Sequence, residues 1–325
     1  MVSLLLDLFE RIVDSEKDKS WSSHTDGAIA LVTSRGIEKF QHPSELRMLI
    51  RLSHHHIIGC IASGSSVPHG MKAIQAYIET RLDSQDPMLR MTKLIIQYAN
   101  LYSHVRKEQL KKEERIGYII ELDAKMPDFD LTLPPAWQYL TTLLDQKSDR
   151  VFDHHFHSFS NTQARQARSM FWVLGILLNE SLIEYYSASP AGDEYFETLD
   201  IANSYTEYLV RETCACTPST MDCDGTAQRR LAVSNTSKPL TLGETCHSHT
   251  PSQQQDGYTM IFPLFIAGRS KIIPNVMPWI IEQLHHMSCH FNLRDAEVVA
   301  QILEQESNVS PWDVYAMLGS YAFAS

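Results

Sequence analysis

The sequence of 325 residues lacks any long apolar run. The longest, Phe171–Leu178, falls far short of the roughly 20 apolar residues that a transmembrane helix needs. Residues 1–10 contain no basic segment, and Asp7 interrupts their apolar run, so we expect no secretory signal. We therefore predict a protein that is not secreted and that has no membrane partner.

Cysteine is also scarce, and its six copies are too few in a chain of this length for a disulfide framework. This indicates an intracellular protein. The cysteines are Cys60, Cys214, Cys216, Cys223, Cys246 and Cys289. Glycine and proline, with 13 and 14 copies, are too few for a collagen-like or low-complexity chain, whereas 43% hydrophobic residues can form a sizeable core.

Positively charged residues are fewer than negatively charged ones. The sequence has 28 Lys and Arg residues and 39 Asp and Glu residues, which gives a net charge of −11. The densest basic cluster, Arg106–Lys112, contains Glu108 and precedes Glu113 and Glu114. Opposite charges this close cancel most of the local potential within a Debye length of about 8–10 Å. Because so acidic a chain repels phosphate backbones, we expect no direct binding of nucleic acid by this chain alone.

Alternating strand patterns are nearly absent, and apolar residues recur mainly at helical spacing. Helix start signals lie at His42-Pro43, Asp86-Pro87, Asn161 and Asp193, and further helices are predicted over Met260–Ala267, Val276–Phe291 and Ala296–Leu303. Residues 218–255 are rich in Ser, Thr, Asp and Gly, which favours a long loop or disordered insert. The sequence thus predicts a single all-α domain over residues 1–325, a large multi-helix bundle or array with this one irregular insert and no sheet of three or more strands.

Common catalytic fingerprints are missing. The sequence contains no GxGxxG, GxxxxGK[ST], GxSxG or HExxH motif. We therefore assign no catalytic, cofactor-binding or metal-ligating residue, and we expect no cofactor and no enzymatic activity.

Histidine, with 15 copies, forms three clusters that we weighed as metal ligands. The side chains of His54–His56 splay about 100° apart on a helix and cannot share one ion. Residues 153–157, Asp-His-His-Phe-His, are interpreted as a solvated loop rather than a metal site. His286 and His290, near His285 and Cys289, have the spacing of a zinc pair, but we favour a partly exposed helix flank.

Other patterns also receive structural interpretations. The groups Cys214-x-Cys216-x6-Cys223 and Cys246-His247-x-His249 lack the CxxC spacing of structural zinc sites, so we expect no tight zinc binding there. The acidic residues Asp26, Glu38 and Glu45 are expected on solvated faces. The aromatic residues Trp137, Phe171, Trp172, Tyr186, Trp279 and Trp312 are expected in the core rather than in a ligand pocket.

The segment Trp21–Gly36, WSSHTDGAIALVTSRG, resembles the W-x-x-H-x-D-G-A-x-x-L-x-x-x-R-G segment of fungal-specific transcription factors. In that family it belongs to a large helical regulatory domain, which follows a binuclear zinc cluster. Further resemblances follow in order, at Leu49–Pro68, Ala202–Pro218, Phe262–Gly268 and Trp279–Ile281.

These motif residues have structural interpretations. Gly36 suits a left-handed helix end, and His24 or Thr25 suits a helix cap. Pro263 would start or kink a buried helix, and Gly268 would let the chain turn.

The resemblance implies a transcriptional regulator of a fungal secondary-metabolite or nutrient pathway, located in the nucleus, or otherwise in the cytoplasm. It would act through protein partners, either a DNA-binding regulator or a second copy of itself, and through a small-molecule effector. The zinc cluster and basic stretch of the family are not found in this sequence, and the resemblance leads us to expect that its first residues already belong to the helical domain. A truncated transcription factor, a free-standing relative and a repurposed relative all fit this departure. The alternatives are a small-molecule-binding protein or biosynthetic enzyme on the same scaffold, and a non-functional fragment.

Overall fold

The computed structural model describes residues 21–188, 193–221 and 249–318. The chain divides into two compact units, with the boundary between Lys125 and Met126. The expectation of a single domain over residues 1–325 stays a prediction. None of the described helices combines the length and the apolar character that crossing a membrane requires.

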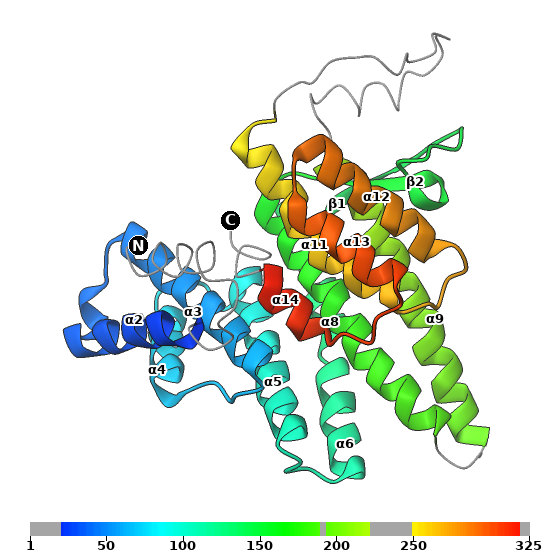
Figure 1. The fold of residues 1–325 in the computed structure, drawn as a ribbon. Helices are drawn as coiled ribbons and strands as arrows, with labels where there is room; N and C mark the ends of the chain where they lie inside the picture. Colours follow the sequence, from blue (N-terminus) through cyan, green and yellow to red (C-terminus); the bar gives the residue numbers. More distant parts are fainter. Residues whose placement is uncertain (1–20, 189–192, 222–248, 319–325) are drawn as a thin grey trace. The chain divides into compact units, whose positions relative to one another are not determined.

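The described part of the first unit is helical, and its longest helix, α3, packs against α2, α4 and α5 (Figure 1). Its elements are α2 (Trp21–Arg35), the 3-10 turn η1 (Ile37–Lys39), α3 (Pro43–Ser63), α4 (His69–Glu79), α5 (Pro87–Arg106) and α6 (Lys112–Asp123). The two helix starts predicted in this unit, at His42-Pro43 and Asp86-Pro87, are confirmed. The His42 side chain accepts a hydrogen bond from the Ser44 amide at the start of α3, and Asp86 accepts one from the Leu89 amide in α5.

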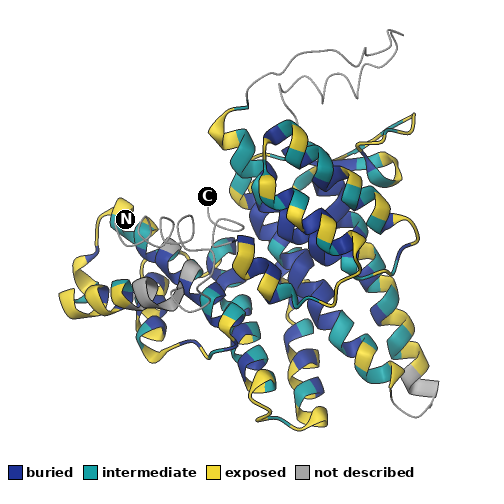
Figure 2. Ribbon diagram, viewed as in Figure 1, coloured by how far each residue is buried: buried dark blue, intermediate teal, exposed yellow. Residues whose placement is uncertain are grey.

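The second unit is built around α8, which packs against α9 and α11. Its helices are α7 (Met126–Leu131), α8 (Thr162–Ser187), α9 (Asp193–Cys216), α11 (Pro251–Arg269), α12 (Val276–Phe291), α13 (Arg294–Glu304) and α14 (Pro311–Leu318). Nearly every residue of α8 from Ala164 to Asn179 is buried, as is most of α11 from Gly257 to Gly268 (Figure 2). A helix buried on all sides must be covered by neighbours all round, so α8 forms the centre of this unit.

A short hairpin accompanies these helices. Strands β1 (Tyr139–Leu143) and β2 (His155–Phe159) pair antiparallel, with Tyr139 opposite Phe159 and Leu143 opposite His155. The 3-10 turns η2 (Pro135–Trp137), η3 (Phe152–His154) and η4 (Pro218–Thr220) complete the unit. Mostly helical character is confirmed, and no sheet of three strands occurs in the described residues. The hairpin itself was not predicted, because strands of five residues are too short to show a clear alternation.

The predicted insert over residues 218–255 has the wrong limits. Pro218–Thr220 form η4, and α11 already begins at Pro251. Thr250 caps that helix, since its hydroxyl accepts the Gln253 amide while the Gln253 side chain accepts the Thr250 amide. Residues 222–248 lie outside the described part of the chain.

The first family-like segment forms α2. His24 and Thr25 lie inside this helix, so the prediction that one of them caps its start is wrong. Gly36 follows the helix end with φ +90°, as expected for a glycine there, but its ψ of 116° lies outside the left-handed helical region.

The segment Phe262–Gly268 lies within α11 and is buried. Pro263 is therefore in the helix interior and does not start a helix. Gly268 does not turn the chain, because α11 continues to Arg269. A Cβ atom at Gly268 would lie 3.2 Å from Leu303 Cδ1, so this glycine allows α11 to approach α13 closely.

We predict that Gly175→Ala destabilises the protein. A Cβ atom at this position in α8 would lie 2.7 Å from Cδ1 of Leu209, whose side chain in α9 is fully buried, so the two helices would have to shift or Leu209 to change its rotamer. Overpacking of this kind costs about 1–3 kcal/mol. Urea unfolding followed by circular dichroism measures the effect. The matched control is Gly117→Ala in α6, where a Cβ meets nothing within 4 Å and a gain of up to about 1 kcal/mol is expected. Equal effects of the two substitutions would contradict close packing of α8 on α9.

Candidate functional site

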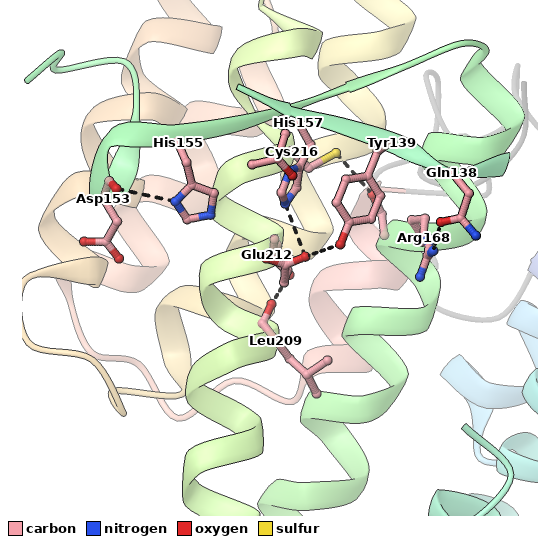
Figure 3. A network of polar contacts seen from close by, with 12 residues as sticks. Gln138, Tyr139, Asp153, His155, His157, Arg168, Leu209, Glu212 and Cys216 are labelled. Atoms are coloured by element: carbon pink, nitrogen blue, oxygen red, sulfur yellow. Dashed lines mark hydrogen bonds and ion pairs between the residues drawn. The ribbon is translucent and has the colours of Figure 1, made fainter. Parts of the chain in front are cut away.

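The hairpin brings polar side chains from two strands onto one face. Thr141 lies opposite His157 in the register, and residues two apart on a strand point to the same side. Tyr139, Thr141, His155 and His157 therefore share a face. Figure 3 shows that Tyr139, His155 and His157 point from the hairpin toward Glu212, which lies one turn before the end of α9.

The carboxylate of Glu212 is the meeting point of this cluster. The Tyr139 hydroxyl donates a hydrogen bond of 2.5 Å to Glu212 Oε2, and His157 Nε2 lies 3.2 Å from the same oxygen. Only 2% of the His157 side chain and 9% of the Glu212 side chain are exposed. The interaction therefore lies in the protein interior, away from bulk water. Electrostatic contacts are stronger there than at the surface.

The imidazole of His157 is fixed on its other sides. Its Nδ1 lies 3.1 Å from Thr141 Oγ1, within hydrogen-bond distance. The ring packs against the rings of Tyr139 and Trp172, with centroid distances of 4.1 and 6.1 Å. Although Nε2 is close to Glu212, it is not aligned for a hydrogen bond with any group and is a buried nitrogen without a hydrogen-bond partner.

His155 completes the cluster from the half-exposed side. Its Nδ1 lies 3.4 Å from the backbone carbonyl oxygen of Asp153, a distance at the limit of hydrogen bonding. If Nδ1 makes this contact, Nε2 is the ring nitrogen that can serve as a ligand atom. His155, His157 and Glu212 each offer a ligand atom, and these three atoms lie within 4.8 Å of one another. Among the described residues, this is the one group of three or more such side chains that could hold a metal ion.

Two arginines near the cluster are already paired. Arg168 of α8 forms an ion pair with Asp130, donates a 3.1 Å hydrogen bond to Gln138 Oε1, and lies 5.1 Å from the centre of the Tyr139 ring. Arg211 of α9 forms ion pairs with Asp153 and Glu207. These ion pairs neutralise both guanidinium groups near the cluster.

The pKa shifts define the charge state of the cluster. Burial raises the pKa of the Glu212 carboxyl, but the neighbouring His157 and the Tyr139 hydroxyl outweigh burial and hold that pKa below its usual value. Burial, with the negative charge of Glu212, raises the pKa of Tyr139 and of Tyr208. Glu212 is thus ionised at neutral pH, and Tyr139 keeps its proton and acts as a donor. The carboxylate oxygen of Glu212 and the imidazole nitrogens of His155 and His157 are together atoms that can bind a cation.

The prediction for residues 153–157 is wrong where it matters for this site. Asp153 and His154 are exposed, as expected of a solvated segment, but His157 is buried and both His155 and His157 belong to β2. The third member, Glu212, is 55 positions further along the chain and was missed. The alternation His-x-His within a strand is the one signal in the sequence that pointed to a shared face.

The other histidine clusters lie elsewhere. His54 and His56 are in α3, where burial lowers the pKa of His54 to about 4 and its Nε2 lies 2.6 Å from Thr92 Oγ1. His286 and His290 stack on α12 with a centroid distance of 4.7 Å, and His249 lies against His290. Burial lowers the pKa of His286 to about 3.

The cysteine groups are only partly described. Cys214 and Cys216 are buried in α9, and burial raises the pKa of Cys216 to about 12, so its thiol stays protonated. Cys223, Cys246 and His247 lie outside the described residues. The expectation of no zinc at these two groups stays a prediction.

The acidic and aromatic residues considered as candidates differ in how far they are buried. Glu38 is exposed, and Glu45 accepts the His42 amide at the start of α3; the side chain of Asp26 lies outside the described ones. Phe171, Trp172 and Trp312 are in the core, as predicted. The prediction is wrong for the other three, because Trp137, Tyr186 and Trp279 are half-buried.

Comparison with protein-family models, curated proteins and solved structures finds no match to this chain.

We predict that Tyr139→Phe lowers stability by about 1–3 kcal/mol at neutral pH, because a buried carboxylate loses a hydrogen-bond donor. Since the folded pKa of Glu212 is below 4.5, its contribution is complete above 4.5 and disappears as the pH falls through the folded value. The difference between wild type and variant should therefore shrink in acid. Urea unfolding at several pH values measures it, with the exposed Tyr118→Phe as the control. A difference that grows in acid would contradict the ionised Glu212.

Proposed function

We propose that this chain is a regulatory protein that controls transcription through protein contacts and a small-molecule effector, without binding DNA itself. The sequence resemblance at Trp21–Gly36 and Phe262–Gly268 to fungal-specific transcription factors supports this proposal. A fungal secondary-metabolite or nutrient pathway and a nuclear location are the corresponding expectations. The mostly helical fold is compatible with it.

The observation that carries the proposal is an exposed face of α9. Ile201, Ser204, Tyr205 and Tyr208, with Glu197 and Asp200, line an open hollow along this helix. The exposed fractions of Ile201 and Tyr208 are 63% and 45%. Apolar and aromatic side chains rimmed by carboxylates are typical of a surface that binds another protein. We call these six residues the α9 face.

The α9 face also reaches the polar cluster. Tyr208 and Glu212 are one helical turn apart, and burial, followed by the charge of Glu212, raises the pKa of Tyr208. A molecule that changes the surroundings of Glu212 therefore acts close to the surface that would contact a protein partner. This arrangement supports control by an effector.

We predict that Ile201→Asp abolishes regulation in the organism while the protein still folds. Deletion of the gene should change the transcript levels of a set of genes, and wild type should restore them. Ile201→Asp should not restore them, because a charge in the α9 face opposes burial against a partner. Val298→Asp, which changes an exposed aliphatic residue of α13, is the matched control and should restore them. Unchanged transcripts after deletion, or full restoration by Ile201→Asp, would contradict the proposal.

We predict no shift of promoter DNA by the isolated chain at physiological salt. With a net charge of −11, the chain has no surplus of Lys and Arg to neutralise several phosphates. An electrophoretic mobility assay over a range of salt concentrations tests this, with a scrambled duplex as the control. Sequence-specific nanomolar binding that weakens steeply with salt would overturn this part of the proposal.

The second candidate is a small-molecule-binding protein or enzyme built on the same helices. The buried group of Tyr139, His157 and Glu212 favours it, because a phenol, an imidazole and a carboxylate together can orient a polar ligand. Incubation of the purified protein with intermediates of a neighbouring pathway distinguishes the two candidates. Turnover of an intermediate would establish the enzyme.

A further inference from the structure

We propose that His155, His157 and Glu212 form a binding site for a divalent first-row transition metal, with Zn²⁺ as the reference ion. The site lies where β2 of the hairpin faces α9. It goes beyond the proposed regulatory function, since metal binding at these residues is independent of whether the chain controls transcription.

The spacing of the ligand atoms suits a tetrahedral ion. Two atoms that lie 2.0–2.1 Å from a tetrahedral zinc ion are about 3.3 Å apart. His157 Nε2 and Glu212 Oε2 are 3.2 Å apart and hence already occupy one edge of such a tetrahedron. His155, on the same face of the strand, lies within 4.8 Å and can supply a third ligand by a small movement of its half-exposed side chain.

The buried Nε2 atom of His157 points to the same conclusion. A buried imidazole nitrogen without a hydrogen bond is costly, and native proteins rarely leave one unsatisfied. If Nδ1 donates its proton to Thr141 Oγ1, Nε2 carries a lone pair, and that lone pair faces the carboxylate rather than a donor. In that tautomer the two electron pairs repel each other, whereas a cation between them would satisfy both.

The outer contacts match those of known metal sites. A metal-bound histidine commonly uses its second nitrogen for a hydrogen bond that fixes the ring. Thr141 Oγ1 is within reach of that nitrogen in His157, and the Asp153 carbonyl is near it in His155. The ligating carboxylate is fixed in the same way, because Tyr139 donates to Glu212 Oε2.

The ligand types select the class of metal. Imidazole nitrogen binds Zn²⁺, Cu²⁺, Ni²⁺ and Fe²⁺, whereas Mg²⁺ and Ca²⁺ prefer sites made of oxygen. One carboxylate and two neutral imidazoles leave a charge of +1 on a divalent complex. Arg168 and Arg211 do not oppose the ion strongly, because Asp130, Asp153 and Glu207 neutralise them. Three protein ligands would leave a fourth position for water or an effector atom.

Zinc titration of the purified, chelator-treated chain tests the proposal. The wild type should bind one more equivalent of Zn²⁺ than His155→Gln, a change at a half-exposed position. His154→Gln, at the exposed neighbouring histidine outside the cluster, is the matched control and should bind as wild type does. Mg²⁺ should not compete. Circular dichroism confirms that each variant is folded.

A second variant separates the metal site from a structural role. Thr141→Val keeps all three ligands but removes the hydroxyl beside His157, and it should weaken zinc affinity about 10- to 100-fold. Bound Co²⁺ supplies a further readout, because its visible absorption should disappear in His155→Gln and persist in His154→Gln.

Two outcomes overturn the proposal. In the first, wild type and His155→Gln bind zinc with the same stoichiometry and affinity. In the second, the equivalent disappears only on His290→Gln, which would assign the metal to His249, His286 and His290 instead.

Discussion

The burial of α8 is the constraint on which the second unit depends. The helix is covered nearly all round, although its buried stretch contains Arg165 and Arg168. A guanidinium group away from water is costly unless a partner neutralises it. Asp256 of α11 pairs with the first arginine, and Asp130 of α7 pairs with the second. The requirement to pair these charges thus fixes α7 and α11 against the central helix.

The same constraint positions the hairpin. Arg168 holds Gln138 by a hydrogen bond and lies against the ring of Tyr139, the first residue of β1. Tyr139 in turn reaches Glu212 of α9, so the strands are held against both central helices. The polar cluster is therefore a consequence of how buried charges are satisfied in this unit. It sits beside the α9 face, which makes one small region the centre of both the regulatory proposal and the metal proposal.

Much of the helical framework could be predicted, because local signals specify it. The side chains of His42, Asp86 and Asn161 each accept a hydrogen bond from a backbone amide two or three residues further along, so the signal for the helix start is local in the sequence. The hairpin could not be predicted, since its five-residue strands are held by contacts with distant helices. The cluster was missed for the same reason: Glu212 meets His157 only after β2 packs on α9, and sequence spacing carries no record of that contact. The prediction for Gly268 failed because its neighbour Leu303 comes from another helix.

Anomalous diffraction at the zinc absorption edge, recorded from crystals grown with one equivalent of Zn²⁺, tests the central claim most directly. We predict a single strong peak within bonding distance of His155 Nε2, His157 Nε2 and Glu212 Oε2, with Tyr139 still bonded to the carboxylate. A map with no peak at these atoms, or with its strongest peak beside His286 and His290, would contradict the account.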